Sequence, residues 1–145
     1  MISNLTKDKG DIGLISVILD LQKKGVKSCL PIAEHLPFDL IAVSETGKLL
    51  RVSVKYVRMK RKGISVRLKS VYSNLKGRFD KTVDFNLIDC IAVFCPDTEI
   101  CYYIGVENLK PRKSVFTLRH KSDVIKFGKP INFAENFYNI EKLWK

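Results

Sequence analysis

The segment LPFDLIAVSETGKLLRVSVKY, residues 36–56, places the strongest constraint on what this chain can fold into. Two apolar runs flank a short polar stretch, Glu45-Thr46-Gly47-Lys48, and this pattern predicts a β-hairpin whose strands are largely buried. The first strand opens with an aspartate, Asp39, and the second carries a lysine, Lys55. Because burying an unpaired charge costs free energy, each of them must be paired or bound to another group.

The other elements follow from periodicity and from turn residues. A helical period over residues 7–24 places Ile12, Ile15 and Leu19 on one face, with Leu14, Ile18 and Leu21 beside it, and Gly25 is placed to end the helix. Strands are expected at residues 26–32, 38–43, 49–57, 64–68, 88–94, 100–106 and 114–119. We expect the strand at 64–68 to join the sheet of the hairpin.

Two further segments complete the chain. Residues 70–83 show weak periodicity and predict a long, basic connection. Residues 133–144 predict an amphipathic helix, with Phe137, Ile140 and Trp144 on one side. The whole order predicts an α/β fold with a mixed sheet flanked by helices, in a single domain over residues 1–145.

Bulk composition narrows the functional class. The chain has 145 residues with 46% hydrophobic and 28% charged residues, as in ordinary globular domains. Its apolar runs are too short for a membrane span, and the first residues lack the apolar core of a signal peptide, so we expect a cytoplasmic protein.

Cysteine and histidine are not arranged as metal ligands. Cys29, Cys90, Cys95 and Cys101 lack the paired short spacings of a zinc site, and we expect buried, reduced thiols. His35 and His120 are too few and too far apart for a histidine site, and we expect ordinary surface residues. Any metal must therefore be bound by oxygen.

The charge balance indicates a polyanionic partner. Lys and Arg total 26 against 15 Asp and Glu, a net charge of +11, and RMKRKG at residues 58–63 concentrates four cations. Nucleic acid is favoured over an anionic membrane surface, because no basic amphipathic helix with a strong apolar face is evident. The side chains expected to contact DNA are Lys7, Lys9, Arg58, Lys60, Arg61, Lys62, Arg67, Lys69, Lys76, Arg78, Lys81, Arg112 and Lys113.

Asp39 and Lys55 fit one chemical site. Side chains two apart on a strand share a face, so Ser53 and Lys55 point the same way, and Asp39 on the partner strand can lie across from them. A carboxylate and a backbone carbonyl can hold Mg²⁺ or Mn²⁺, and a nearby lysine can act on a phosphodiester. Solvated charges at the edge of a turn give the same pattern, and the pattern alone leaves that alternative open.

Several segments, KGDIG, PFDLIAV and GKLLRVSVKY, resemble the PD-(D/E)XK nuclease superfamily, and more narrowly its small branch of bacterial intron-encoded homing endonucleases. The matching motifs are Pro37-Phe38-Asp39-Leu40 and Val52-Ser53-Val54-Lys55. The resemblance implies a restriction-endonuclease-like core. It also implies that Asp39 is the principal metal ligand, that Val54 binds the metal through its carbonyl, and that Lys55 is the catalytic lysine.

The sequence departs from the family pattern at two positions. Ser53 stands where the family has Glu or Gln, and the resemblance then gives Ser53 a catalytic-site contact through water. Leu14 stands where the helix of the family often carries Glu. Asp11, three residues earlier on nearly the same face, can supply that carboxylate to the metal and the reaction, or it is a solvated acid favoured by the helix dipole.

The resulting expectation is a Mg²⁺-dependent, site-specific double-strand DNA endonuclease of the homing type. Cleaving both strands requires two sites, so we expect a homodimer at least, with a homotetramer as the favoured larger form. The aromatic residues of segments 101–104 and 133–144 are the expected contact surface. Two alternatives remain, a catalytically silent nucleic-acid-binding module with the same fold and a Holliday-junction-type resolvase.

Overall fold

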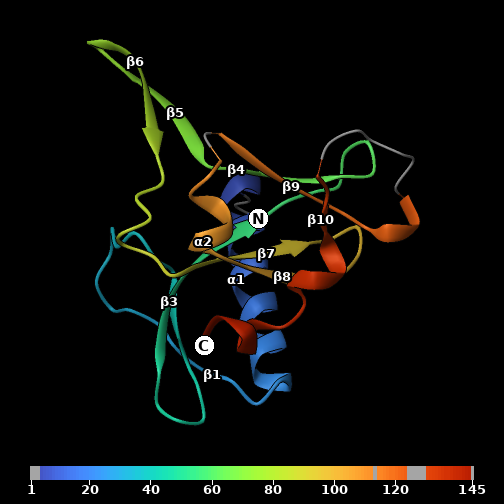
Figure 1. Ribbon diagram of the computed structural model, residues 1–145. Helices are drawn as coiled ribbons and strands as arrows, with labels where there is room; N and C mark the ends of the chain where they lie inside the picture. Colours follow the sequence, from blue (N-terminus) through green and yellow to red (C-terminus); the bar gives the residue numbers. More distant parts are fainter. Residues whose placement is uncertain (1–3, 113, 124–129, 145) are drawn as a thin grey trace.

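A five-stranded mixed sheet forms the centre of the computed structural model, which describes residues 4–112, 114–123 and 130–144 (Figure 1). Its strands lie in the order β1-β2-β3-β7-β8. β3 and β7 are parallel and the other neighbours are antiparallel, which confirms the mixed sheet. The strands are β1 (Lys27–Cys29), β2 (Leu40–Val43), β3 (Leu49–Tyr56), β7 (Cys90–Cys95) and β8 (Ile100–Gly105).

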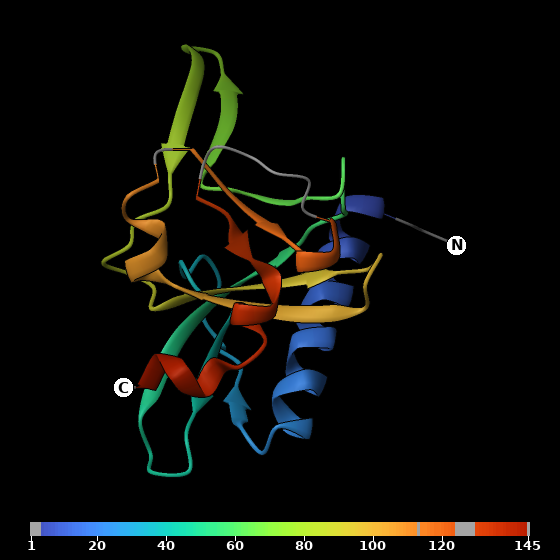
Figure 2. The ribbon, with the colours of Figure 1, turned by 45° about the vertical axis from the view of Figure 1, so that its right-hand side comes forward.

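Helix α1, Leu5–Lys23, covers one face of this sheet (Figure 2). Its buried positions are Gly13, Val17 and Leu21, spaced by four residues. The stripe predicted from Ile12, Ile15 and Leu19 faces solvent instead, with exposed fractions of 48%, 64% and 53%. The packed stripe contains a glycine, which lets the helix approach the sheet more closely than a stripe of large side chains would.

A second, three-stranded sheet packs on the other face of the central sheet, in the order β10-β9-β4. It consists of β4 (Ile64–Arg67), β9 (Val115–Arg119) and β10 (Asn132–Phe133). The buried side chains of β4 and β9 share one cluster with Ile91 and Val93 of β7. The prediction that residues 64–68 extend the hairpin sheet is therefore wrong, because β7 already occupies the free edge of β3.

The chain between β4 and β7 forms a two-stranded ribbon that projects from the body (Figures 1 and 2). The ribbon consists of β5, Lys69–Asn74, paired with β6, Gly77–Thr82, and every residue of both strands is exposed. The long, basic connection predicted over residues 70–83 thus contains two paired strands that the sequence pattern did not predict. Because neither face of the ribbon is buried against the body, the segment lacks the apolar–polar alternation by which strands are recognised in a sequence.

The segment predicted as one helix over residues 133–144 is instead two short 3₁₀ helices, η2 (Ala134–Phe137) and η3 (Ile140–Trp144). Phe137 packs edge-to-face on Phe116 with ring centroids 5.7 Å apart, while Ile140 is buried in the cluster under α1. The two pieces thus anchor to opposite sides of the sheet, which a continuous helix could not do. The remaining short helices are α2 (Val106–Leu109) and η1 (Lys121–Asp123).

None of the helices within the described residues has both the length and the apolar character needed to cross a membrane. The cysteines follow the prediction in part, since Cys90, Cys95 and Cys101 are buried and free, whereas Cys29 on the short edge strand β1 is exposed. Burial raises the pKa of the Cys101 thiol to about 12, so this side chain stays protonated at neutral pH.

Candidate active site

Asp39 lies at the entrance to β2 and is attached to β3 at two points. Its backbone N–H donates to the Val52 carbonyl at 2.9 Å, and its carboxylate Oδ2 accepts a hydrogen bond from the Val54 N–H at 2.6 Å. The chain bends here, because Phe38 packs on one side of the sheet and Leu40 is buried on the other. The second carboxylate oxygen, Oδ1, accepts no hydrogen bond from any described residue.

Ser53, Val54 and Lys55 follow one another on β3 at the level of Asp39. Leu40 pairs with Val52 across the hairpin, so Asp39 stands opposite Ser53. The β7 partners of Ser53 and Lys55 belong to the cluster on the face away from α1, and both side chains therefore share that face. Ser53 is only 8% exposed and Lys55 is partly exposed. The structure thus brings these predicted site residues to one place on the hairpin.

The backbone of Val54 adds an oxygen at this place. Its N–H points toward Asp39, away from β7, and the N–H and C=O of one strand residue point to the same side. The Val54 carbonyl and the Asp39 carboxylate therefore face the same edge, and oxygen ligands are those that Mg²⁺ prefers. Nowhere in the described part of the chain do three or more His, Cys, Asp or Glu side chains gather as a metal site, so further ligands would come from water or substrate.

Helix α1 borders this junction through Gly13 and Leu14. A Cβ added at Gly13 would lie 3.4 Å from Cβ of Tyr56, the last residue of β3, so the helix and the strand end are in close contact. Leu14 lines a hollow of about 260 Å³ beside Asp39. The residues that line it are Leu14, Leu30, Pro31, Ala33, His35, Leu36, Phe38 and Asp39.

Asp11 is not brought to Asp39 by any hydrogen bond or ion pair of the described residues. It is exposed on α1, about one turn before Leu14. An apolar side chain, not a carboxylate, therefore occupies the helix position that faces the hollow. Asp11 remains the nearest acid along the helix on that side.

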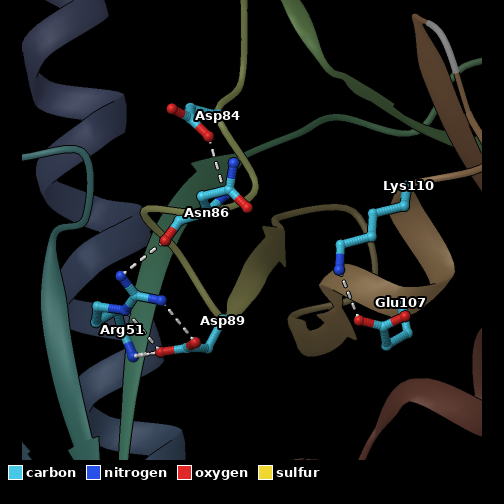
Figure 3. A network of polar contacts seen from close by, with 6 residues as sticks. All are labelled: Arg51, Asp84, Asn86, Asp89, Glu107 and Lys110. Carbon is cyan, nitrogen blue, oxygen red and sulfur yellow. Dashed lines mark hydrogen bonds and ion pairs between the residues drawn. The ribbon is translucent and has the colours of Figure 1, made fainter.

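An ion pair holds β3 in register with β7 just before the site (Figure 3). Asp89 accepts hydrogen bonds from the backbone N–H, Nε and Nη2 of Arg51 at 2.7, 2.9 and 2.9 Å, and Nη1 of Arg51 donates to the Asn86 carbonyl at 3.0 Å. The hydrogen bonds from Arg51 hold the pKa of the Asp89 carboxyl below its usual value. Arg51 is therefore a structural residue of the strand that carries Ser53 and Lys55.

Three cations predicted to contact DNA form a tight turn between β3 and β4. Lys60 and Gly63 are bridged to each other, and Arg61 and Lys62 between them have φ of 50° and 57°. Positive φ at both central residues is the type I′ arrangement, which costs about 1 kcal/mol or more for each non-glycine residue. The turn thus presents two cations at its tip at a cost in stability.

The other predicted DNA contacts within the described residues are also exposed, but two of these side chains already contact another residue. Arg58 is held by Asp97 at 3.0 Å, and the guanidinium of Arg112 lies 5.8 Å from the ring centroid of Phe116. Lys113 lies outside the described residues. The remaining exposed cations are Lys7 and Lys9 at the start of α1, Arg67 at the end of β4, and Lys69, Lys76, Arg78 and Lys81 on the ribbon.

Two residues, His120 and Gly13, have packing roles that the sequence did not predict. His120 is not an ordinary surface residue, because its side chain is 15% exposed and its Nε2 lies 3.1 Å from the Tyr102 hydroxyl. Gly13 was not singled out, although a glycine inside a helical pattern often marks a close packing contact. Here that contact joins α1 to the end of the strand that carries Lys55.

Comparison with known proteins gives two positive findings. A family model described as PD-(D/E)XK endonuclease matches residues 4–140. A solved structure titled as a bacterial homing endonuclease, I-Ssp6803I, is similar in fold, with a TM-score of 0.76 and 20% identity over 97% of this chain and 93% of that one. No curated protein matches the chain. These findings confirm the predicted restriction-endonuclease-like core.

Proposed function

Because this chain belongs to the PD-(D/E)XK endonuclease family, we propose that it is a Mg²⁺-dependent, site-specific endonuclease that cleaves both strands of DNA, of the homing type. The observation that carries the proposal is the hydrogen bond between the Asp39 carboxylate and the Val54 N–H, on the hairpin that also carries Lys55. The similar fold of a homing endonuclease supports the homing type, but at 20% identity that likeness concerns the fold alone.

Each residue at the hairpin junction has a role in this proposal. Asp39, through Oδ1, and the Val54 carbonyl are the oxygens that fit a hard divalent ion such as Mg²⁺ or Mn²⁺. When bound, such an ion polarises the scissile phosphate and lowers the pKa of a bound water. Lys55 orients the attacking water or offsets the negative charge that develops on the phosphate. Ser53, buried beside it, contacts the site through water.

Asp11 is the carboxylate that α1 would contribute to the proposed site. The helix position that faces the hollow beside Asp39 is Leu14, which carries no acid. The exposure of Asp11 leaves it free to reach a bound metal through a water ligand. Asp11→Asn should then reduce cleavage, whereas Asp8→Asn on the same helix should not. Equal activity of both variants would remove Asp11 from the site.

The proposed substrate is double-stranded DNA. The net charge of +11 favours a polyanion, and exposed cations lie on the Lys60–Gly63 turn, on the ribbon and at the start of α1. In Figures 1 and 2, the ribbon and the start of α1 lie toward the end of the molecule to which β3 runs. A duplex against this end would contact these cations while it approached Lys55.

Cleavage of two strands requires two copies, so we propose a homodimer at least, with a homotetramer as the larger form. The aromatic surface expected from segment 101–104 is wrong, because Tyr102 and Tyr103 are buried within the protomer's own core. Exposed apolar side chains lie instead on α1. They are Leu5, Ile12, Ile15 and Leu19. We propose this face of α1 as the contact between copies.

A catalytically silent DNA-binding module is the alternative that particular observations favour. Ser53 supplies no carboxylate on β3, and Leu14 supplies none on α1. Such a module would bind DNA through the same cations but would not hydrolyse it.

One experiment separates these functions. The protein is incubated with a library of duplex DNA and Mg²⁺, and the ends produced are sequenced. Discrete ends, present on both strands, support the endonuclease; intact DNA that is nevertheless bound supports the silent module. Cuts confined to four-way junctions in a parallel reaction would instead indicate a resolvase.

A further inference from the structure

The β5–β6 ribbon is the most prominent feature that the hairpin site does not use. It extends from the body in both views, and all twelve of its strand residues are exposed (Figures 1 and 2). The hydrogen bond from Val83 N–H to the Leu68 carbonyl closes its base. An exposed two-stranded ribbon gains little from burial and is marginally stable by itself, so contact with a partner would stabilise it.

The two faces of the ribbon differ in chemistry. Cross-strand partners share a face, and the pairing Tyr72–Phe79 places both rings on one side, stacked with centroids 5.5 Å apart. On that side the Ser70 hydroxyl donates to the Lys81 carbonyl at 3.4 Å, and Asn74 Oδ1 accepts from the Lys76 N–H at 2.8 Å. The polar groups of Ser70 and Asn74 are therefore used within the ribbon itself.

The opposite face keeps its hydrogen-bonding groups available. The pairs Lys69–Thr82, Val71–Asp80 and Ser73–Arg78 place six side chains on it. Within the part of the chain that the structure describes, none of the five polar ones makes an ion pair or a side-chain hydrogen bond. This polar face, Lys69, Val71, Ser73, Arg78, Asp80 and Thr82, combines donors, an acceptor and one apolar group.

That combination matches the edges of base pairs in the major groove. Arginine donates to guanine, a carboxylate accepts from cytosine, serine and threonine contact either kind of edge, and an apolar side chain contacts the thymine methyl. The major groove is about 12 Å wide and admits a two-stranded ribbon. Six residues of strand extend about 20 Å, the length of roughly six base pairs.

Resting on the proposed DNA endonuclease function, we propose that the ribbon enters the major groove with its polar face toward the bases and determines the sequence that is cut. Arg78 is the principal base contact. The Tyr72–Phe79 stack lies on the far side and stiffens the ribbon, while Lys81 and the Lys60–Gly63 turn contact phosphates. Specificity and cleavage are then carried by separate elements, the ribbon and the hairpin.

Selection of bound duplexes from a randomised library, in Ca²⁺ so that no cleavage is needed, tests this assignment. Arg78→Ala should lose its preference at one or two adjacent positions and bind the wild-type sequence roughly 5- to 150-fold more weakly. Lys81→Ala, a cation on the other face of the same ribbon, is the matched control. It should weaken binding to all sequences alike and keep the preference unchanged.

Because no described residue holds the Arg78 side chain, both variants should unfold at the wild-type temperature, which a thermal scan checks. A base preference that is intact in Arg78→Ala would overturn the assignment, as would wild-type binding without any preference. Sequence-specific binding without cleavage in Mg²⁺ would contradict the endonuclease and leave the role of the ribbon standing. The two failures are therefore distinguishable.

Discussion

The carboxylate of Asp39 accepts a 2.6 Å hydrogen bond from the backbone N–H of Val54. This bond joins the entrance of β2 to β3 at the level where Ser53 and Lys55 emerge on the same strand. It uses one carboxylate oxygen, and the other accepts no hydrogen bond from any described residue. A charged residue at the start of a buried hairpin is thus satisfied in part by the backbone, and its remaining oxygen is available to a ligand.

Lys55→Ala should lose cleavage by at least about a hundredfold while DNA affinity in Ca²⁺ stays within about tenfold of the wild type. The reason is that one cation among the many on the binding surface contributes little to affinity, whereas a group beside the reacting phosphate acts in the transition state. Single-turnover cleavage and filter binding measure the two quantities. Lys27→Ala on the edge strand β1 serves as the control and should cut normally; wild-type rates in Lys55→Ala would remove the lysine from the chemistry.

The Lys60–Gly63 turn should contribute to the salt dependence of binding. Replacing Lys60 with Ser, Arg61 with Asn and Lys62 with Gly removes three cations and installs the residue pair that such a turn favours, so the backbone is kept. The slope of log affinity against log salt should fall by roughly one unit for each phosphate that the turn no longer neutralises. Replacing Lys23, Lys27 and Lys142 with Ser is the charge-matched control at the other end of the molecule. If both triple variants changed the slope equally, the turn would have no special part in binding.

The Arg51–Asp89 pair should stabilise the fold above about pH 4 and lose this contribution in acid. The pKa of the Asp89 carboxyl is lowered in the folded state by the hydrogen bonds from Arg51. Its stabilisation is thus fully present above the unfolded pKa of about 3.9 and disappears as the pH falls through the lower, folded pKa. Both side chains are about a third exposed, so the pair contributes roughly 0.5–1 kcal/mol.

Chemical unfolding between pH 2 and pH 7 measures this contribution. Arg51→Met should be less stable than the wild type at pH 7, and the difference should shrink toward pH 2. Glu107→Gln, which removes the exposed Glu107–Lys110 pair, should stay close to the wild type throughout. A constant deficit of Arg51→Met at all pH values would show that weaker packing, and not the ion pair, is responsible.

Assembly through α1 should be sensitive to charge on its exposed apolar face. Ile15 and Leu19 are 64% and 53% exposed, and Lys at both positions keeps the helix propensity high while it adds like charges to a contact between copies. Light scattering should report a monomeric mass for this variant and a dimer or tetramer for the wild type, with and without DNA. The variant should nick DNA but rarely cut both strands. Leu49→Lys, at a 62% exposed position on β3, should assemble normally. A monomeric wild type would contradict the proposed assembly.

Local patterns were enough to predict the hairpin, β7 and β8, because their side chains face a core and alternate or run apolar accordingly. They did not predict which face of α1 is buried. The close contact between Gly13 and Tyr56 depends on how the helix packs on β3, which the sequence of the helix alone does not specify. The ribbon was missed because neither of its faces meets the core. The aromatic segment at residues 133–144 was wrongly predicted as one helix, because its two pieces pack on opposite sides of the sheet. Of the candidate site, the placement of Asp39 across from residues 53–55 was predicted from motif and register, whereas the hydrogen bond to the Val54 N–H depends on a bend that no pattern encodes.

Asp39→Asn tests the central claim most directly. An asparagine can still accept the hydrogen bond from the Val54 N–H, so the hairpin should keep its geometry, but it lacks the negative charge that holds a divalent ion. Cleavage in Mg²⁺ and affinity for the same duplex in Ca²⁺ are measured side by side, with Asp84→Asn as control, because Asp84 likewise accepts a backbone hydrogen bond, from Asn86 N–H at 2.9 Å. We predict that Asp39→Asn loses cleavage while its affinity stays within about tenfold of the wild type, and that Asp84→Asn retains both. Cleavage by Asp39→Asn at the wild-type rate would contradict the assignment of this hairpin as the active site.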